Sequence, residues 1–559
     1  VVIRDAVRWR EYERQGQMES KSPPGEGGGT PPLLHHPSSS PRELSLSPAM
    51  RGLLLCLASL ATAVLAKRFA VYRIIPQTND SLQFLEGLTK DTGIDFWKEP
   101  RAVGQEVHAM IPDPKAGPLL DQLRLHNITY SMMIEDVEKV IKNQKLARLK
   151  LKSERRQKDF RDGKVDFNLA EYHSFADVIN YFNALAITYP QFVSVQPIGL
   201  THEGRQIPMI KITNKRLTGP KRSIWIDGGI HAREWISPST VLYFIHQLIN
   251  GYDQDPIIRR YVDNIEWHLI PLLNPDGYEY SRSSTDPEIR LWRKNKSPAK
   301  CTTTAQGLFQ PPQTTCCQGV DLNRNFDWFF GQVGSSTDPC SEIYNGAFAF
   351  SEPETRAVRD YVSQHPMTSF VTLHSYSQIL MYPFGHQVRT YSNDLDDLRN
   401  TALSAANALQ RLYGTTYKVG TGADTLYPAS GGSEDWAKGK GGVKYSYLFE
   451  LRPEEQVWDG FLLPENQIMP TARETWEAIK VIATHTLAVP LGAGAAASGG
   501  FHHSRARAPS PSHHSPPSSA FVCRDHDQLC GAWAAGGACE TWPEMRQRCP
   551  VSCRLCRPE

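Results

Sequence analysis

The sequence predicts an α/β fold for a large central domain, with a small α/β domain before it and a disulfide-rich unit after it. Between residues 166 and 488, β-rich runs alternate with helical patterns, which is typical of an α/β domain. Residues 67–135 follow the order β-α-β-β-α-β of a ferredoxin-like sandwich. Residues 521–556 contain six cysteines, and a unit of that size needs covalent crosslinks.

The elements of the small domain follow from its apolar runs and their spacing. Strands are expected at Phe69–Ile75, Ile94–Trp97, Val107–Ile111 and Ile128–Ile134, and helices at Asp80–Leu88 and Leu119–Leu125.

Residues 136–165 link the two α/β domains and begin with a strongly basic helical pattern. Most charge runs are solvated helices, and that interpretation stays open here. In a secreted protein, a basic segment between two domains favours a connecting helix that an activating protease cuts. Arg155 and Arg156 are the best candidate cleavage sites, and Arg161 is the next.

The first 66 residues are expected to lie outside the folded protein. Residues 1–49 are rich in Ser, Pro and Gly and begin without methionine, so we expect a non-native, disordered leader. Met50-Arg51 is followed by an apolar run, Gly52–Ala66, that ends in small residues. This pattern predicts a secretory signal peptide over residues 50–66, although a buried helix is an alternative. The protein is therefore expected to be secreted.

Charge and hydropathy argue against two classes of partner. The chain of 559 residues has 61 basic and 59 acidic side chains and a net charge of +2, which argues against nucleic acid as the main partner. No apolar run is long enough to span a membrane. Of the eleven cysteines, Cys56 would leave with the signal peptide, and an even remainder in an oxidising compartment favours disulfides over metal sites.

Two histidines and two glutamates follow β-like runs that lie far apart in the sequence. Functional groups gather where the strands of an open α/β sheet end, so we expect these side chains to meet. Two histidines and one carboxylate can hold a catalytic zinc ion, and a second carboxylate can act as a base on water. The histidines are His231 and His374, after the runs 223–226 and 369–373, and the glutamates are Glu234 and Glu450, the latter after the run 445–449.

Capping residues predict where two helices of the large domain begin. Ser237, followed by Pro238, is expected to cap a helix, which would leave His231 and Glu234 in the turn between strand and helix. Thr471 and Glu474 are expected to form a capping box at the beginning of the last helix, which would end near Leu487.

Six motifs occur in a fixed order through the large domain. They are His-Ala-Arg-Glu-Trp at 231–235, Leu-Trp-Arg-Lys at 291–294, Gly-Val-Asp-Leu-Asn-Arg-Asn-Phe-Asp at 319–327, Thr-Leu-His-Ser-Tyr-Ser-Gln at 372–378, Leu-Tyr-Pro-Ala-Ser-Gly-Gly-Ser at 426–433 and Phe-Glu-Leu-Arg at 449–452. With these motifs, residues 67–488 resemble the pancreatic-type zinc metallocarboxypeptidases of the A/B branch. The resemblance implies an inhibitory propeptide at 67–135 and a catalytic domain at 166–488. It also implies a mixed sheet with helices on both faces.

The resemblance gives a role to each polar residue of these motifs. His231, Glu234 and His374 would hold one Zn²⁺, the ligand set for which carboxypeptidase A is known. The metal would lower the pKa of a bound water, and Glu450 would take the proton of that water. Arg293 would stabilise the oxyanion that develops during hydrolysis. The implied substrate-binding residues are Asn323 and Arg324 for the terminal carboxylate, Tyr427 as a mobile tyrosine, and Arg233.

Glu434 stands where the resemblance places the specificity residue of the pocket. A-type members have an aliphatic residue there and B-type members an aspartate. A buried carboxylate needs a cation to compensate it, and a C-terminal Lys or Arg side chain provides one. Gly422 matches the small residue of the B-type pocket. We therefore expect release of Lys or Arg; the alternatives are a Glu434 that turns outward to water, and A-type release of aliphatic or aromatic residues.

Two cysteine pairs are expected in the catalytic domain. By the resemblance, Cys317 and Cys340 match the family's disulfide. Cys301 and Cys316 would then close a long loop that follows Arg293, although the adjacent Cys316 and Cys317 leave the pairing open.

The six cysteines of residues 521–556 follow a linker, residues 489–520, that is rich in Ala, Gly, Ser, Pro and His. Their spacing resembles the ShK toxin-like domain, although spacing alone allows fifteen connectivities. No Lys or Tyr lies between Cys523 and Cys556, so we expect an extracellular protein partner, or a passive stabilising role, instead of channel block. The pairing that the resemblance implies is Cys523–Cys556, Cys530–Cys549 and Cys539–Cys553.

Two hypotheses of different classes follow. The first is a secreted zymogen that removes single C-terminal residues from peptides and proteins after an activating protease cuts the link. The second is a non-catalytic secreted binding protein that acts through its tail. The intact ligand set and Glu450 favour the enzyme. Three asparagines lie in N-glycosylation sequons, Asn79, Asn127 and Asn295.

Overall fold

The computed structural model describes residues 68–89, 91, 93–155, 165–304, 313–491, 534 and 551–554. The expected leader, signal peptide and Arg156 lie outside these residues. The chain divides into two units, 1–494 and 495–559, and the fold reported below belongs to the first. Within the described ranges, no helix combines the length and the apolar character that a membrane span requires.

Among the described residues, the large domain contains an eight-stranded sheet in the order β13-β12-β14-β11-β7-β8-β6-β5. The central strands β14, β11, β7 and β8 run parallel, whereas β12–β14, β6–β8 and β5–β6 pair antiparallel. The predicted mixed sheet is therefore confirmed. The strands are β5 (Val193–Leu200), β6 (Gln206–Ile212), β7 (Arg222–Gly228), β8 (Ile265–Ile270), β11 (Ser369–Ser377), β12 (Ile379–Tyr382), β13 (Lys418–Thr421) and β14 (Tyr445–Glu454).

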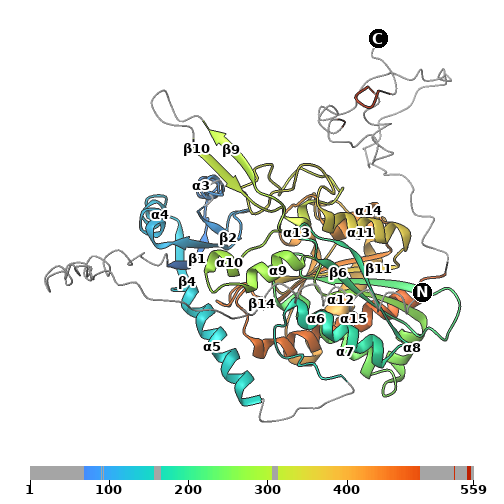
Figure 1. Cartoon of the computed structure of the whole chain (residues 1–559). Helices are drawn as coiled ribbons and strands as arrows, with labels where there is room; N and C mark the ends of the chain where they lie inside the picture. The colour runs from blue at the N-terminus through green and yellow to red at the C-terminus, as the bar shows by residue number, and fades with distance from the viewer. Residues whose placement is uncertain are drawn as a thin grey trace, which may run out of the picture. The chain divides into compact units, whose positions relative to one another are not determined.

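Alternate side chains of β7 are buried against two different layers of helices. Ile224 and Ile226 belong to a core with α6, α7, α12 and α15, whereas Trp225 belongs to a second core with α11 and α14. In the view of Figure 1, α7 and α15 lie below the sheet and α11 and α14 above it. Helices therefore cover both faces, as predicted. Their bounds are α6 (Phe175–Thr188), α7 (Ile236–Asn250), α11 (Pro353–Gln364), α12 (Leu395–Tyr413), α14 (Ser433–Gly439) and α15 (Ile468–Ala488).

Helix α7 begins at Ile236, so the prediction of Ser237 as its cap was wrong. The hydroxyl of Ser237 donates to the carbonyl oxygen of Glu234 and accepts from the N–H of Gly229, both at 3.0 Å. Ser237 therefore fastens the turn that carries His231 and Glu234 to the end of β7, instead of capping the helix.

The capping box predicted for the last helix was also wrong, because α15 begins at Ile468. Thr471 lies inside the helix and donates to the carbonyl oxygen of Gln467 at 2.7 Å. Glu474 is buried and pairs with Arg452 at 2.6 Å, so tertiary contacts use the side chain that the pattern assigned to a cap.

The small domain has a four-stranded antiparallel sheet in the order β2-β3-β1-β4, covered by α3 and α4. The predicted order β-α-β-β-α-β is confirmed. Helix α4 begins earlier than predicted, because Asp113 and Pro114 occupy its first turn. The elements are β1 (Phe69–Ile75), α3 (Asn79–Leu88), β2 (Asp95–Lys98), β3 (Val107–Pro112), α4 (Asp113–Leu125) and β4 (Thr129–Ile134).

Strand β1 is buried on both faces. Ala70, Tyr72 and Ile74 pack into the small domain's own core, whereas Phe69 and Val71 point into a cluster that is shared with the large domain. We call this shared group the interface cluster. It comprises Phe69, Val71, Trp97, Met110, Ile134, Val137 and Ile141, with Leu291, Tyr376, Phe461 and Leu462 from the large domain.

The basic link begins as helix α5 (Val137–Arg155), which ends at one candidate cleavage residue. The long loop after Arg293 contains a hairpin of β9 (Lys300–Thr304) and β10 (Gln313–Cys317), labelled in Figure 1. The remaining short elements are α8 (Pro256–Asn264), α9 (Pro275–Arg282), α10 (Pro287–Arg290), η1 (Leu322–Arg324), α13 (Gly422–Thr425) and η2 (Glu465–Gln467).

Candidate active site

The ends of three adjacent parallel strands bring the predicted site residues to one edge of the sheet. The turn after β7 carries His231 and Glu234, β11 carries His374, and β14 carries Glu450. His374 and Glu450 are register partners across β11 and β14. All four side chains line one cleft.

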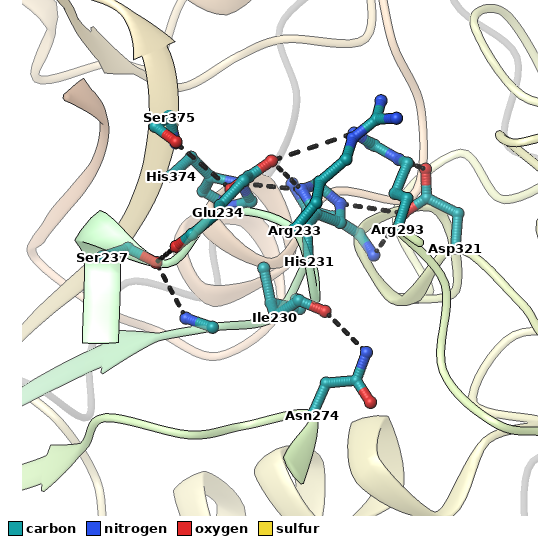
Figure 2. Close-up of polar contacts among 12 residues, drawn as sticks. Ile230, His231, Arg233, Glu234, Ser237, Asn274, Arg293, Asp321, His374 and Ser375 are labelled. Atoms are coloured by element: carbon teal, nitrogen blue, oxygen red, sulfur yellow. Dashed lines mark hydrogen bonds and ion pairs between the residues drawn. The ribbon is translucent and has the colours of Figure 1, made fainter. Parts of the chain in front are cut away.

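Glu234 lies between the two histidines, as Figure 2 shows. Its Oε1 is 2.8 Å from Nδ1 of His231, and its Oε2 is 3.2 Å from Nδ1 of His374. The two Nδ1 atoms are 3.1 Å apart. Each of the three side chains is at most 3% exposed, so three donor atoms converge on one buried point.

This geometry fits zinc. Tetrahedral coordination with Zn–N bonds of 2.0–2.1 Å places ligand atoms about 3.3 Å apart, close to the separations found here. Imidazole nitrogen and carboxylate oxygen also suit this borderline ion. Although burial raises the pKa of Glu234, the two neighbouring histidines lower it well below its ordinary value, which keeps the carboxylate available as a ligand.

Asp321 is a site residue that sequence reasoning did not assign. Its Oδ1 accepts from Nε2 of His231 at 3.0 Å, and its Oδ2 accepts from Nε and Nη2 of Arg293 at 3.1 and 2.9 Å. This bond places the imidazole proton on Nε2 and leaves Nδ1 free for a metal. In Figure 2, Asp321 lies beside Arg293, and a dashed line joins it to His231. The available signal was its position just before Asn323 and Arg324 in one of the six motifs.

Glu234 has a further contact that the sequence did not indicate. The backbone N–H of Ser375 donates to its Oε2 at 3.2 Å, which ties the turn after β7 to β11. Ser375 directly follows His374, so the two metal-binding segments are fixed to each other by main-chain as well as side-chain groups.

Arg324 and Asn323, predicted to bind a terminal carboxylate, line the same cleft as the metal ligands. Nε of Arg324 donates to the carbonyl oxygen of Gly334 at 2.7 Å, and its Nη1 donates to that of Asn323 at 3.0 Å. Oδ1 of Asn323 accepts from the N–H of Ser433 at 2.9 Å. These bonds hold a buried guanidinium at the cleft wall, where a carboxylate can pair with it.

Glu434 lines the cleft, so the alternative in which it turns outward to water is wrong. Its Oε2 is buried and has no hydrogen-bond partner, and burial together with Asp435 raises its pKa to about 7. Gly422 lines the cleft beside it, and a Cβ there would lie 3.0 Å from Cα of Gly385. The backbone at Gly422 therefore packs closely against Gly385, and the cleft is acidic at Glu434.

Glu450 also presents a buried Oε2 without a hydrogen-bond partner. Burial raises its pKa to about 8, although His374 acts in the opposite direction. Such a pKa lies close to neutral pH, which suits a group that must take up a proton and release it again.

Two predicted substrate-binding residues contact the small domain instead of solvent. Nη1 of Arg233 donates to both carboxylate oxygens of Asp95, each at 3.0 Å. The guanidinium of Arg101 lies 4.9 Å from the centre of the Tyr427 ring. The small domain therefore contacts two residues that were predicted to bind substrate.

The structure pairs Cys301 with Cys316 and Cys317 with Cys340. In the second unit, Cys553 is disulfide-bonded. The other five cysteines of the predicted tail lie outside the described residues, namely Cys523, Cys530, Cys539, Cys549 and Cys556.

A sheet edge that gathers two histidines, a glutamate ligand and a second, unpartnered glutamate defines a zinc-dependent hydrolase. Comparison with known families makes the class specific. The zinc carboxypeptidase model matches residues 178–478, the carboxypeptidase activation peptide model matches residues 72–144, and the ShK domain-like model matches residues 522–556. The chain belongs to the zinc carboxypeptidase family, and it is an exopeptidase with an activation propeptide and a C-terminal ShK-like domain.

Known relatives match over most of their length. Bovine carboxypeptidase A1 is 37% identical over 448 residues, which is 78% of this chain and 99% of the relative. Mouse carboxypeptidase A2 is 37% identical over 418 residues, 74% of this chain and 93% of the relative. The crystal structure of thrombin activatable fibrinolysis inhibitor matches with a TM-score of 0.63 and 30% identity, and covers 76% of this chain and 99% of that chain.

Proposed function

We propose that this zymogen, once activated, releases C-terminal Lys and Arg from peptides and proteins. The observation that supports this specificity is Glu434, a cleft carboxylate with a buried Oε2 that has no partner. A cationic substrate side chain would compensate this charge, whereas an apolar one would leave it buried and unpaired. Gly422, which has no side chain, lines the same cleft as Glu434.

A-type specificity is the second candidate, because the relatives reported above bear A-type names. The identity of 37% is an average over more than 400 aligned residues, whereas the choice of the released residue depends on the few side chains around Glu434. The two candidates therefore rest on different observations, and one set of substrates separates them.

In the proposed reaction, Arg324 and Asn323 bind the terminal carboxylate of the substrate and so place the last peptide bond in the cleft. A zinc ion held by His231, Glu234 and His374 would activate water and polarise the scissile carbonyl. Glu450 takes a proton from that water and passes it to the departing amine. Arg293, fixed by Asp321, stabilises the negative oxygen that forms.

Activation requires removal of the small domain. Residues 67–135 act as the propeptide, 136–165 as the activation link and 166–488 as the catalytic domain. A trypsin-like protease would cut at Arg155 or Arg156, where α5 ends. The contacts of Asp95 with Arg233 and of Arg101 with Tyr427 support inhibition by occupation of the substrate site.

The protein is secreted in this proposal, through a signal peptide at residues 50–66, and the ShK-like tail binds an extracellular protein partner after the linker at 489–520. The family match at residues 522–556 supports a separate tail module. A passive role for the tail predicts unchanged binding to extracellular material when the tail is deleted.

The test uses the full chain after limited trypsin treatment, with and without a zinc chelator. Matched peptides ending in Arg, Lys, Phe, Leu and Glu are compared by kcat/KM. Chelator-sensitive release of Arg and Lys is expected. Release of Phe or Leu instead would agree with carboxypeptidase activity but contradict the proposed Lys and Arg specificity, in favour of the A-type alternative. Failure to cleave any of these peptides would favour the non-catalytic hypothesis.

A further inference from the structure

The two zinc-binding histidines are oriented by different groups. His231 donates from Nε2 directly to the carboxylate of Asp321 at 3.0 Å. Nε2 of His374 lies 3.3 Å from Oγ1 of Thr372, two residues earlier on the same face of β11. A hydroxyl can donate or accept, so Thr372 by itself does not determine which nitrogen of His374 carries the proton.

Asp227 determines the direction of this hydrogen bond. Oγ1 of Thr372 donates to Oδ1 of Asp227 at 2.8 Å, across the register pair that joins β11 to β7. The other oxygen, Oδ2, accepts from Nε1 of Trp225 at 2.7 Å, a nitrogen that can only donate. Because the hydroxyl proton of Thr372 points at Asp227, its oxygen is left to accept from His374. All four residues are at most 1% exposed, so water does not replace these partners.

We propose that Thr372 and Asp227 are positioning residues for the catalytic metal: their hydrogen bonds hold the proton of His374 on Nε2 and so direct the Nδ1 lone pair at zinc. Within the described residues, Thr372 Oγ1 is the hydrogen-bond partner of Nε2. Without it, a proton on Nδ1 would compete with the metal, and the ring would lose its fixed orientation. The inference rests on the zinc site and is independent of which residue the enzyme releases.

The test measures the zinc dissociation constant of the full chain by competition with a chromophoric chelator, at a temperature where the zinc-free variants are folded by circular dichroism. Thr372→Val has nearly the same shape and lacks the hydroxyl. We expect it to bind zinc about 10- to 100-fold more weakly, the usual effect of losing such an outer partner. Thr372→Ser keeps the hydroxyl and should bind zinc like the wild type.

The matched control is Thr240→Val, which removes an equally buried hydroxyl that bonds the carbonyl oxygen of Ile236 within α7. Its zinc affinity should not change. Asp227→Asn is an independent test. Its amide N–H would donate to the hydroxyl oxygen of Thr372, so the hydroxyl proton would turn towards Nε2 of His374 and favour a proton on Nδ1 of that histidine. Zinc binding should weaken by at least the factor expected for Thr372→Val.

Two results would overturn the proposal. One is a Thr372→Val variant whose zinc affinity lies within about twofold of that of Thr240→Val. The other is a Thr372→Ser variant as weak as Thr372→Val, since that result would assign the effect to packing. As a second readout, the cobalt-substituted Thr372→Val protein should show a changed visible spectrum, because the ligand ring is no longer fixed.

Discussion

His374 and Glu450 face each other as register partners on the adjacent parallel strands β11 and β14. A zinc ligand and a carboxylate with an unpartnered oxygen are therefore spaced by the sheet itself, where neighbouring strands lie about 4.8 Å apart. Loops carry the other residues of the site, but the hydrogen-bonded backbone of the sheet sets the spacing between the zinc ligand His374 and the proposed base Glu450.

Replacement of Glu450 by glutamine should remove the proton acceptor while keeping the shape of the side chain. We expect kcat/KM to fall by about 10²- to 10⁴-fold, with the zinc content of the protein unchanged. Glu454→Gln, at an exposed position of the same strand, is the control and should retain full activity. A Glu450→Gln enzyme with more than a tenth of normal activity would contradict the assignment.

Replacement of Glu434 by glutamine should act on basic substrates alone. Loss of one partner of a buried ion pair costs about 3–5 kcal/mol, so kcat/KM for a C-terminal Arg peptide should fall at least 100-fold. A Leu peptide serves as the internal control and should change little. Equal losses on both peptides would mean that Glu434 supports the fold of the cleft and not its selectivity.

Replacement of Asp95 by asparagine should loosen the small domain in the uncut chain. The contact of Nη1 of Arg233 with both oxygens of Asp95 is charge-assisted and worth about 1.5–3 kcal/mol, so residual activity before proteolysis should rise about 10- to 100-fold. Asp121→Asn breaks an exposed ion pair with Arg124 and should have no effect. The measurement is the hydrolysis of a small substrate before trypsin is added.

Asn295 should carry no glycan, although it lies in a sequon. Its Nδ2 donates to Glu352 at 2.8 Å and to Glu354 at 3.0 Å, and the residue is fully buried. Asn79 and Asn127 are exposed and should be modified in a secretory host. Enzymatic deglycosylation in ¹⁸O-labelled water marks each modified asparagine, and a label at Asn295 would show that the chain is glycosylated before this region folds.

Because of Asp394, the free energy of unfolding should decrease as the pH becomes acidic. Although burial raises the pKa of this carboxylate, hydrogen bonds from Lys438 and Lys444, both at 2.8 Å, hold it well below its usual range. The stabilisation is therefore present above the unfolded-state pKa of about 3.9 and is lost as pH falls through the lower folded-state pKa.

Asp394→Asn should consequently lower the free energy of unfolding by about 1–2 kcal/mol at pH 7. The difference from the wild type should shrink below about pH 4. Asp396→Asn, at an exposed carboxylate in the same first turn of α12, is the control. Denaturant titrations of the three proteins at each pH provide the comparison, and a difference that is constant with pH would contradict the assignment.

Local sequence predicted the strands of this protein well and its long-range contacts poorly. Strand β1 was predicted at its observed bounds, because apolar runs that end at turn residues have few alternative structures. The zinc ligands were predictable because each follows an apolar run that belongs to a strand, β7 for His231 and Glu234 and β11 for His374. Ser237 was assigned wrongly, since its hydroxyl serves a tertiary contact. The pairing of Arg233 with Asp95 could not be predicted, because the two residues are 138 positions apart and no local sequence pattern connects them.

The interface cluster has a consequence for the timing of activation. Apolar packing around Phe69 and Val71, together with the pair of Asp95 and Arg233, holds the small domain without help from the peptide bond that is cut. Hydrolysis of a bond near Arg155 breaks none of these contacts. We therefore expect enzymatic activity to appear with a lag after the chain is cut, and the length of that lag measures the lifetime of a noncovalent complex between the two halves.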